Sequence, residues 1–214
     1  MRVAVAGSDP DELLETLVGE LQRRNPGAAA HARRVASLAL AIGMEMGVPD
    51  TELAVVEQAA LLHDVGKLAL PLELMYRSGG VTADDLAYIR THPQIAYRIL
   101  CHAQALRLVA DVVRATHEAW DGHGHPRRLA GRDIPIGARI IAVADTWDVL
   151  TSGMVGEPCE PDVALAELVR ASGTYFEPDV VHAAFSVIER RQRSACVVPS
   201  RPDTDGVPCS VFVH

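Results

Sequence analysis

The sequence predicts an all-α fold from its composition, its apolar periodicity and its helix-capping signals. Hydrophobic residues make up 49% of the 214 residues, yet aromatic residues make up only 4%, so the apolar content is largely alanine, leucine and valine. Such a composition favours helices packed on helices over a sheet sandwich. Apolar residues also recur at helical spacing through most of the chain. A chain of this length can bury a sizeable core as one domain.

In the first half of the chain, prolines and oxygen-bearing caps set the expected helix boundaries. The Ser-Asp-Pro sequence at residues 8–10 predicts the start of a helix that runs to about Arg24. The Asn-Pro-Gly break at 25–27 separates it from an alanine-rich helix that reaches Gly47. A third helix follows the Val-Pro-Asp sequence at 48–50 and ends within residues 61–67.

In the second half, an expected loop at residues 78–80 is followed by Thr82 and Asp85, which predict a capped helix start. The His-Pro pair at 92–93 ends that helix and begins another, because proline suits a first helical turn. A further helix is expected over residues 105–120. Residues 121–135 are rich in glycine, histidine and arginine and predict a long irregular segment, which is more often functional than idle.

Helical periodicity resumes over residues 136–150, and two more helices follow, divided at 172–173 and restarted at Pro178. The expected organisation is an N-terminal extension at 1–9, one domain at 10–191 and a flexible tail at 192–214.

The charge and the cysteines restrict the function classes. The formal charge of -8 has the wrong sign for a protein that holds duplex nucleic acid through its phosphates. No stretch is apolar enough for a membrane segment. The four cysteines show no paired spacing, so reduced thiols and a cytoplasmic location are expected. They are Cys101, Cys159, Cys196 and Cys209.

The nine histidines are the main functional signal. Any one of them alone could be an ordinary surface residue. However, His31, His63 and His117 lie on the apolar faces of their expected helices, and Asp145 lies on the core side of a later one. Burial of an unpaired imidazole or carboxylate is costly, so several such groups are expected to meet. A metal cluster would satisfy them together.

His63 and Asp64 form the sharpest pair. A neutral imidazole beside a carboxylate suits a first-row metal such as iron or manganese. Lys67 follows in the same segment and is the only lysine of the chain. The ammonium of lysine is a compact point charge, whereas the guanidinium of arginine is a broad planar fork. A single lysine in an arginine-rich chain therefore suggests that an ammonium is needed at this position, beside a metal-bound phosphate. The alternative is that a single lysine remains by chance.

Together these motifs resemble the HD-GYP family of the HD-domain metal-dependent phosphohydrolases over about residues 10–191. The resemblance rests on His31, His-Asp-Val-Gly-Lys at 63–67, His-Pro at 92–93, Thr-His-Glu at 116–118, Gly-His-Gly-His-Pro at 122–126 and Ala-Asp at 144–145. It implies an HD-domain helical bundle with two divalent metal ions. A hydroxide activated by both ions would hydrolyse cyclic di-GMP or a related cyclic dinucleotide.

The resemblance also implies roles for particular residues. Six side chains would hold the two ions: His31, His63, Asp64, His92, His117 and Asp145. Asp64 would bridge the ions, and Asp64 and Lys67 would be the catalytic residues, with Lys67 on a phosphate oxygen. His123 and His125 are candidate substrate-binding residues. The alternative is that both are solvent-exposed residues of the loop. No sensor domain fits beside the bundle, so regulation would come from a homodimer or a signalling-protein partner.

Several departures from the family pattern leave alternatives open. Thr116 stands where a second histidine is usual, His125 replaces the tyrosine of Gly-Tyr-Pro, and residues 153–157 lack the arginines common there. Gly27 replaces the glutamate that would help to hold a third metal ion. The chain is therefore expected to be an active cyclic dinucleotide phosphodiesterase. The alternatives are a degenerate member that binds metal, nucleotide or a protein partner without turnover, and an HD-type nucleotidase or phosphatase.

Overall fold

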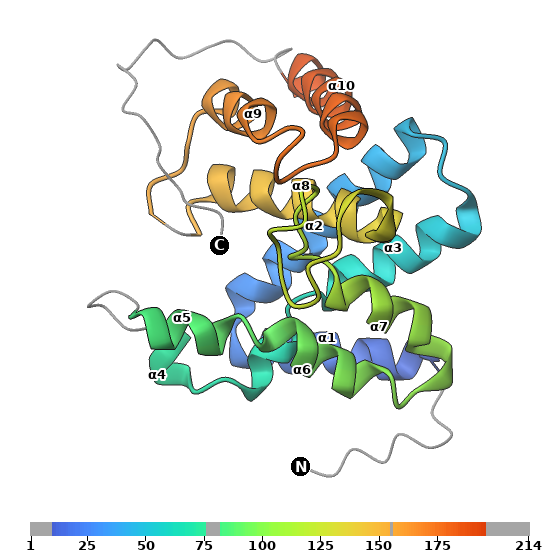
Figure 1. Cartoon of the computed structure of the whole chain (residues 1–214), viewed down its shortest axis with the longest axis vertical. Helices are drawn as coiled ribbons and strands as arrows, with labels where there is room; N and C mark the ends of the chain where they lie inside the picture. The colour runs from blue at the N-terminus through green and yellow to red at the C-terminus, as the bar shows by residue number, and fades with distance from the viewer. Residues whose placement is uncertain (1–9, 76–81, 155, 196–214) are drawn as a thin grey trace.

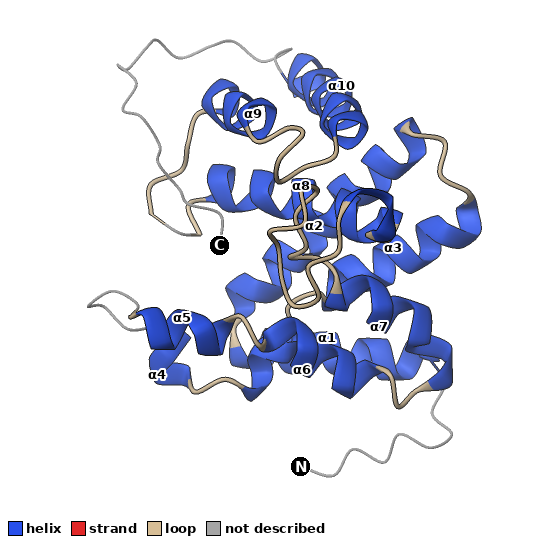
Figure 2. Ribbon diagram, viewed as in Figure 1, coloured by secondary structure: helices blue, strands red, loops and turns tan. Residues whose placement is uncertain are grey.

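The regular elements in the computed structural model are all helical among the residues that it describes, 10–75, 82–154 and 156–195 (Figures 1 and 2). The expected all-α fold is therefore confirmed. The α-helices are α1 (Pro10–Arg24), α2 (Pro26–Glu45), α3 (Asp50–Leu62), α4 (Leu72–Met75), α5 (Ala83–Ile89), α6 (His92–Leu100), α7 (Arg107–Arg114), α8 (Ile136–Ser152), α9 (Pro161–Arg170) and α10 (Pro178–Ala195). Short 3-10 helices are η1 (Val65–Ala69), η2 (Gln104–Leu106) and η3 (Gly131–Asp133).

The helix boundaries follow from the capping residues that the sequence contains. The Asn25 side chain accepts a hydrogen bond from the Ala28 N–H and caps α2. Thr82 and Asp85 form a reciprocal capping box at the start of α5, as predicted. α8 ends at Gly153, whose φ of 68° lies in the left-handed region that glycine adopts without steric cost.

The core of the bundle is built around α2, which packs against α3, α8 and α10. The inward face of α2 carries small buried residues, among them Ala29, Ala32 and Val35, so neighbouring helices can approach closely. Larger residues such as Leu62 and Ile141 fill the remaining space, and each stabilises the fold by roughly 1.5–3 kcal/mol when fully buried. Figure 1 shows α9 and α10 at one end of the bundle and α4, α5 and α6 at the other.

The helix expected over residues 105–120 is shorter than predicted. α7 ends at Arg114, and residues 115–117 form a turn. The chain leaves the helix because the buried carboxylate of Glu118 accepts two backbone N–H groups from the loop that follows, at 2.7 and 3.0 Å. His117 therefore lies on a turn, and its predicted place on a helix face was wrong. α10 runs to Ala195, beyond the expected boundary of the domain at 191.

The cysteines differ from the expectation in one respect. Cys101 is free, but Cys159 is disulfide-bonded, so the prediction of reduced thiols is wrong for Cys159. Among the helices of the described residues, none is long and apolar enough to span a bilayer. The cytoplasmic location stays a prediction. The extension at 1–9, the loop at 78–80 and the tail from 196 onwards lie outside the described residues.

Candidate metal centre

Three helices bring two histidines and a carboxylate to one point. His31 on α2, His63 at the end of α3 and Asp145 on α8 each offer a ligand atom, and these atoms lie within 4.8 Å of one another. His31 Nε2 is 3.1 Å from Asp145 Oδ1, and His63 Nε2 is 3.9 Å from the same oxygen. His31 and His63 are buried, so packing of the helices fixes the cluster in place.

The ring of His63 is oriented by its own helix. Its Nδ1 donates to the Ala60 carbonyl oxygen at 2.7 Å. This contact leaves Nε2 as the ring atom that faces Asp145. A hydrogen bond of this kind sets the tautomer and ring orientation that a metal-binding histidine needs.

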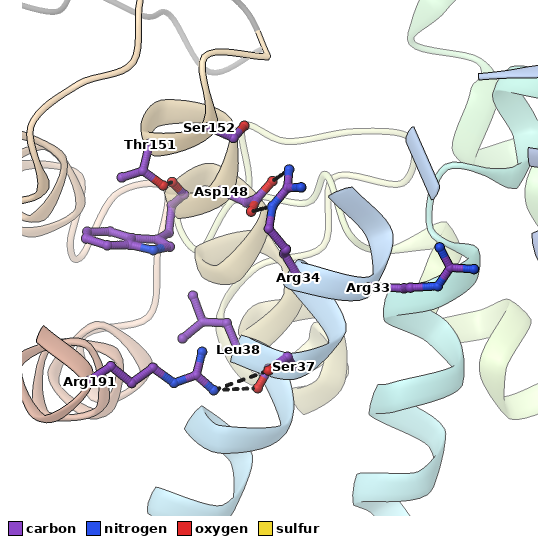
Figure 3. A pocket seen from close by; sticks show the side chains of 9 residues that line it. Arg33, Arg34, Ser37, Leu38, Asp148, Thr151, Ser152 and Arg191 are labelled. Carbon is purple, nitrogen blue, oxygen red and sulfur yellow. Dashed lines mark hydrogen bonds and ion pairs between the residues drawn. The ribbon is translucent and has the colours of Figure 1, made fainter. Parts of the chain in front are cut away.

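His31 is oriented by a second carboxylate, Asp148, that the motif pattern did not single out. His31 Nδ1 lies 2.7 Å from Asp148 Oδ2, and Arg34 donates to both oxygens of Asp148 at 2.6 and 2.8 Å. Figure 3 shows Arg34 extending from α2 to Asp148 on α8. Asp145 and Asp148 have the i, i+3 spacing that places two side chains on one helix face, and this spacing could have indicated the pair.

Asp64 lies between two groups of histidines. Its Oδ1 is 3.6 Å from His63 Nε2 and 3.7 Å from His92 Nε2, and its Oδ2 accepts a hydrogen bond from Lys67 Nζ at 2.7 Å. Burial acts to raise the pKa of Asp64, but the charge of the neighbouring Lys67 ammonium opposes this, and the pKa lies well below its usual range. Burial acts to lower the pKa of Lys67, and Asp64 more than offsets this. The pair is therefore charged, and Asp64 lies between His63 and His92.

His92, at the start of α6, and His117, in the turn after α7, form a second pair. Their Nε2 atoms are 3.2 Å apart, and His92 Nδ1 donates to the Ile89 carbonyl oxygen at 2.9 Å. Burial, with the Lys67 charge, lowers the pKa of His92 to about 4. Burial, with the His92 charge, lowers the pKa of His117 well below its usual value. Both rings are neutral at pH 7, the state in which imidazole binds metal.

Thr116 adds no ligand to this second pair. The residue is buried, and its hydroxyl donates to the Val113 carbonyl oxygen at 3.0 Å, which turns it back toward α7. The second group of ligand atoms therefore consists of His92, His117 and the shared Asp64.

These groups fit divalent first-row cations. A mixture of imidazole nitrogen and carboxylate oxygen suits such metals. Two nitrogens 3.2 Å apart, as in His92 and His117, are also spaced as ligands of one ion, because metal–nitrogen bonds are about 2.0–2.1 Å long. The first group thus fits one such ion, and the His92–His117 pair has the spacing of two ligands of one ion.

A cavity of about 440 Å³ adjoins the second pair, and both candidate substrate-binding histidines line it. His125 stacks parallel on His117, with ring centroids 5.2 Å apart. Burial lowers the pKa of His125, and the charge of Arg90 adds to this. His123 is different, because its side chain is 88% exposed and its Nδ1 lies 3.3 Å from Asp121 Oδ1.

Metal uptake by the first group is expected to release a proton. Burial acts to lower the pKa of His31, but hydrogen bonds to Asp145 and Asp148 outweigh it and raise the pKa to about 9. The metal-free protein therefore carries a proton on His31 at pH 7, and a cation must displace it. We expect metal affinity to rise about tenfold per pH unit between roughly pH 6 and 8 and to level off above about pH 9.

Titration of Mn²⁺ into metal-free protein with a pH indicator would count the protons released. His117→Ala is the matched control, because His117 is already neutral and its loss should leave the pH dependence of the first ion unchanged. An affinity that does not vary with pH would contradict the protonation of His31.

The chain is similar to proteins of one known family. The HD domain family matches residues 15–180 of the chain. The cyclic di-GMP phosphodiesterase response regulator RpfG of Xanthomonas campestris pv. campestris (strain 8004) is 35% identical over 175 residues, which cover 80% of this chain and 46% of that protein. The 3'3'-cGAMP-specific phosphodiesterase 2 of Vibrio cholerae serotype O1 is 33% identical over 195 residues, which cover 90% of this chain and 37% of that protein. The chain spans less than half the length of these relatives.

A solved structure shows the same fold. The HD domain of the L. monocytogenes phosphodiesterase PgpH, in complex with cyclic-di-AMP, matches with a TM-score of 0.63 and 13% sequence identity. The match covers 87% of this chain and 100% of that chain. At this identity the likeness concerns the fold alone, and it confirms the expected HD-domain helical bundle.

Proposed function

The chain belongs to the HD domain family, and we propose that it is a metal-dependent phosphodiesterase that hydrolyses a cyclic dinucleotide. The position of Asp64 carries the proposal, because its Oδ1 lies 3.6 Å from His63 Nε2 and 3.7 Å from His92 Nε2. One carboxylate that faces two groups of histidines suits two neighbouring cations with a shared ligand.

In this proposal the two groups of ligand atoms have separate tasks. His31, His63 and Asp145 would hold the first ion, His92 and His117 the second, and Asp64 both. When bound, the ions supply a nucleophile from water at neutral pH and neutralise phosphate charge. Iron or manganese is proposed because the ligands mix imidazole nitrogen with carboxylate oxygen.

Lys67 is proposed to contact a phosphate oxygen of the substrate. Its ammonium has three donors, and one of them is directed to Asp64 Oδ2 at 2.7 Å. The side chain is 32% exposed, and two donors of the ammonium remain beside the one that Asp64 accepts. Asp64 also holds the ammonium in place, which favours a single position for the contact.

The substrate class is supported by the names of the relatives. One is named as a cyclic di-GMP phosphodiesterase and another as specific for 3'3'-cGAMP. Both names describe phosphodiesters between two nucleosides in a ring, and we propose the same class for this chain. A cytoplasmic location and regulation by a second copy or a signalling partner belong to the proposal.

A second candidate function is metal or nucleotide binding without turnover. The observation that favours it is Thr116, whose hydroxyl is engaged by Val113 and leaves the second ion short of a ligand. On this alternative the first ion binds tightly and the second does not remain bound at working concentrations.

Elemental analysis of protein purified without air, followed by a substrate panel, tests the proposal. The panel holds cyclic di-GMP, 3'3'-cGAMP, cyclic di-AMP and mononucleotides. We expect two metal-binding steps, the second weaker, and a linear dinucleotide product. His31→Ala should remove the tight step and His117→Ala only the weak one.

The other outcomes separate the alternatives. One bound metal with no cleavage of any compound favours the binding role. Cleavage of mononucleotides alone favours an HD-type nucleotidase or phosphatase. Either result would overturn the proposed phosphodiesterase activity.

A further inference from the structure

The cavity beside the second histidine pair has unused hydrogen-bonding capacity. It has a volume of about 440 Å³, and His117, a proposed metal ligand, forms part of its wall. Arg90, His125 and Arg128 line the same cavity. Both ring nitrogens of His125 are buried and have no hydrogen-bond partner. Water cannot reach these two atoms, so the donors that face the cavity are those of the arginines.

The two arginines of this cavity are also unengaged. Within residues 10–75, 82–154 and 156–195, no side-chain or backbone group forms a hydrogen bond or ion pair with the guanidinium of Arg90 or Arg128. Asp121 is the carboxylate that lines the cavity, and its Oδ1 accepts from the backbone N–H of His123 at 3.0 Å. With two arginines and one carboxylate, the lining of the cavity has a net positive charge, whereas the formal net charge of the whole chain is -8.

The larger cavity of Figure 3, about 570 Å³, provides a comparison. Each of its three arginines donates to a protein group: Arg34 to Asp148, Arg191 to the Ser37 carbonyl and Arg33 to Gln22. In that cavity, each arginine thus already has a hydrogen-bond acceptor from the protein. Free guanidinium groups distinguish the cavity beside His117 from this one.

The backbone at Arg128 gives an independent indication. Its φ is 56°, and it is the one residue other than glycine with positive φ among the described residues. Glycine adopts this region without the steric cost that a Cβ brings. A non-glycine residue in a sparsely populated backbone region is often found at a functional site, where the side chain compensates for the strain. The residue with this strained backbone is one of the two arginines whose guanidinium forms no hydrogen bond or ion pair with the described residues.

We propose that Arg90 and Arg128 bind the phosphate of the cyclic dinucleotide that is not being cleaved. The inference rests on the proposed function, because a cyclic dinucleotide carries a second phosphodiester beside the one at the metal ions. A guanidinium fork matches phosphate oxygens in geometry and charge. The cavity adjoins the metal centre through His117, so one ring-shaped ligand can occupy both.

Arg128→Gly tests this assignment, because glycine removes the cation and also relieves the backbone. We expect the melting temperature to stay equal or rise, while the affinity of the full chain for cyclic di-GMP falls about ten- to a hundredfold, as loss of a charge-assisted hydrogen bond predicts. Calorimetry with metal-free protein gives the affinity. In metal-loaded protein KM should rise far more than kcat falls.

Arg127→Ala is the matched control. It removes the same charge one position away, from a side chain that does not line the cavity, and should leave affinity, KM and melting temperature unchanged. If wild type hydrolyses cyclic di-GMP and Arg128→Gly matches it in affinity and KM, the inference fails and the proposed function stands. If wild type neither binds nor cleaves any cyclic dinucleotide, both fail.

A second ligand separates phosphate from base recognition. Guanine and adenine present different edges to an arginine, whereas the phosphates of cyclic di-GMP and cyclic di-AMP are the same. A phosphate contact predicts that Arg128→Gly weakens both ligands by the same factor. A loss confined to the guanine ligand would overturn the phosphate assignment.

Discussion

Asp64→Ala is expected to lose both metal ions and all measurable hydrolysis. The carboxylate is buried and ionised, and its Oδ1 faces His63 and His92 at 3.6 and 3.7 Å. Its removal also leaves the Lys67 ammonium without the partner that it now holds at 2.7 Å, so an uncompensated positive charge would repel incoming cations. Loss of an outer partner of a metal ligand costs about 10- to 100-fold in affinity, and loss of a bridging ligand should cost more.

Elemental analysis and a cyclic di-GMP hydrolysis assay measure both effects. Asp111→Ala is the matched control, because Asp111 is exposed on α7 and lies outside both groups of ligand atoms. It should keep full metal content and full activity. Two bound ions in Asp64→Ala would show that Asp64 is not a shared ligand.

Gly66→Ala is expected to destabilise the fold by roughly 3 kcal/mol or more and to remove the second ion. A Cβ at Gly66 would overlap the His92 carbonyl oxygen and lie 2.8 Å from the Ala96 nitrogen, both backbone atoms of α6. Overpacking a core destabilises a protein by about 1–3 kcal/mol when the neighbouring side chains can move aside. Here the neighbours are backbone atoms of a helix, so the loss of stability is expected at the upper end of that range or above it. The strain can be relieved only by moving η1 away from α6, which separates Asp64 from His92.

Thermal unfolding and metal titration test this expectation. Gly19→Ala is the control, because nothing lies within 4 Å of a Cβ built at that position on α1. It should raise the stability by up to about 1 kcal/mol through helix propensity. A melting temperature of Gly66→Ala equal to that of wild type would mean that η1 and α6 are not in the contact described.

Local signals predicted most of the fold. The capping box at Thr82 and Asp85 depends only on neighbouring residues and forms as expected. The predicted break at 25–27 separates α1 from α2, and there Asn25 caps α2. The end of α7 could not be predicted in this way. The apolar spacing continues past Arg114, but the Glu118 carboxylate binds loop amides further along the chain, and this contact ends the helix.

The residues of the candidate metal centre that belong to a recognisable motif were predicted from the sequence. The proposed ligands come together because His31, His63 and Asp145 project from apolar helix faces toward one core. Asp148 was missed although its i, i+3 spacing from Asp145 was visible. Arg128 gave no signal in the sequence, because nothing about an arginine indicates that its φ is positive.

The anchoring of the loop by Glu118 separates the stability of the loop from the identity of the side chains at its tip. Glu118 holds this loop through the backbone amides of Arg127 and Leu129, so the side chains at positions 125 and 128 are not needed to keep it in place. The proposed ligands of the first ion, by contrast, lie on α2, α3 and α8. Loops mounted on a rigid scaffold accept substitutions that the scaffold does not. Substitutions at positions 125 and 128 are therefore expected to change how tightly the cavity holds a ligand, while the residues proposed to bind the first ion keep their places.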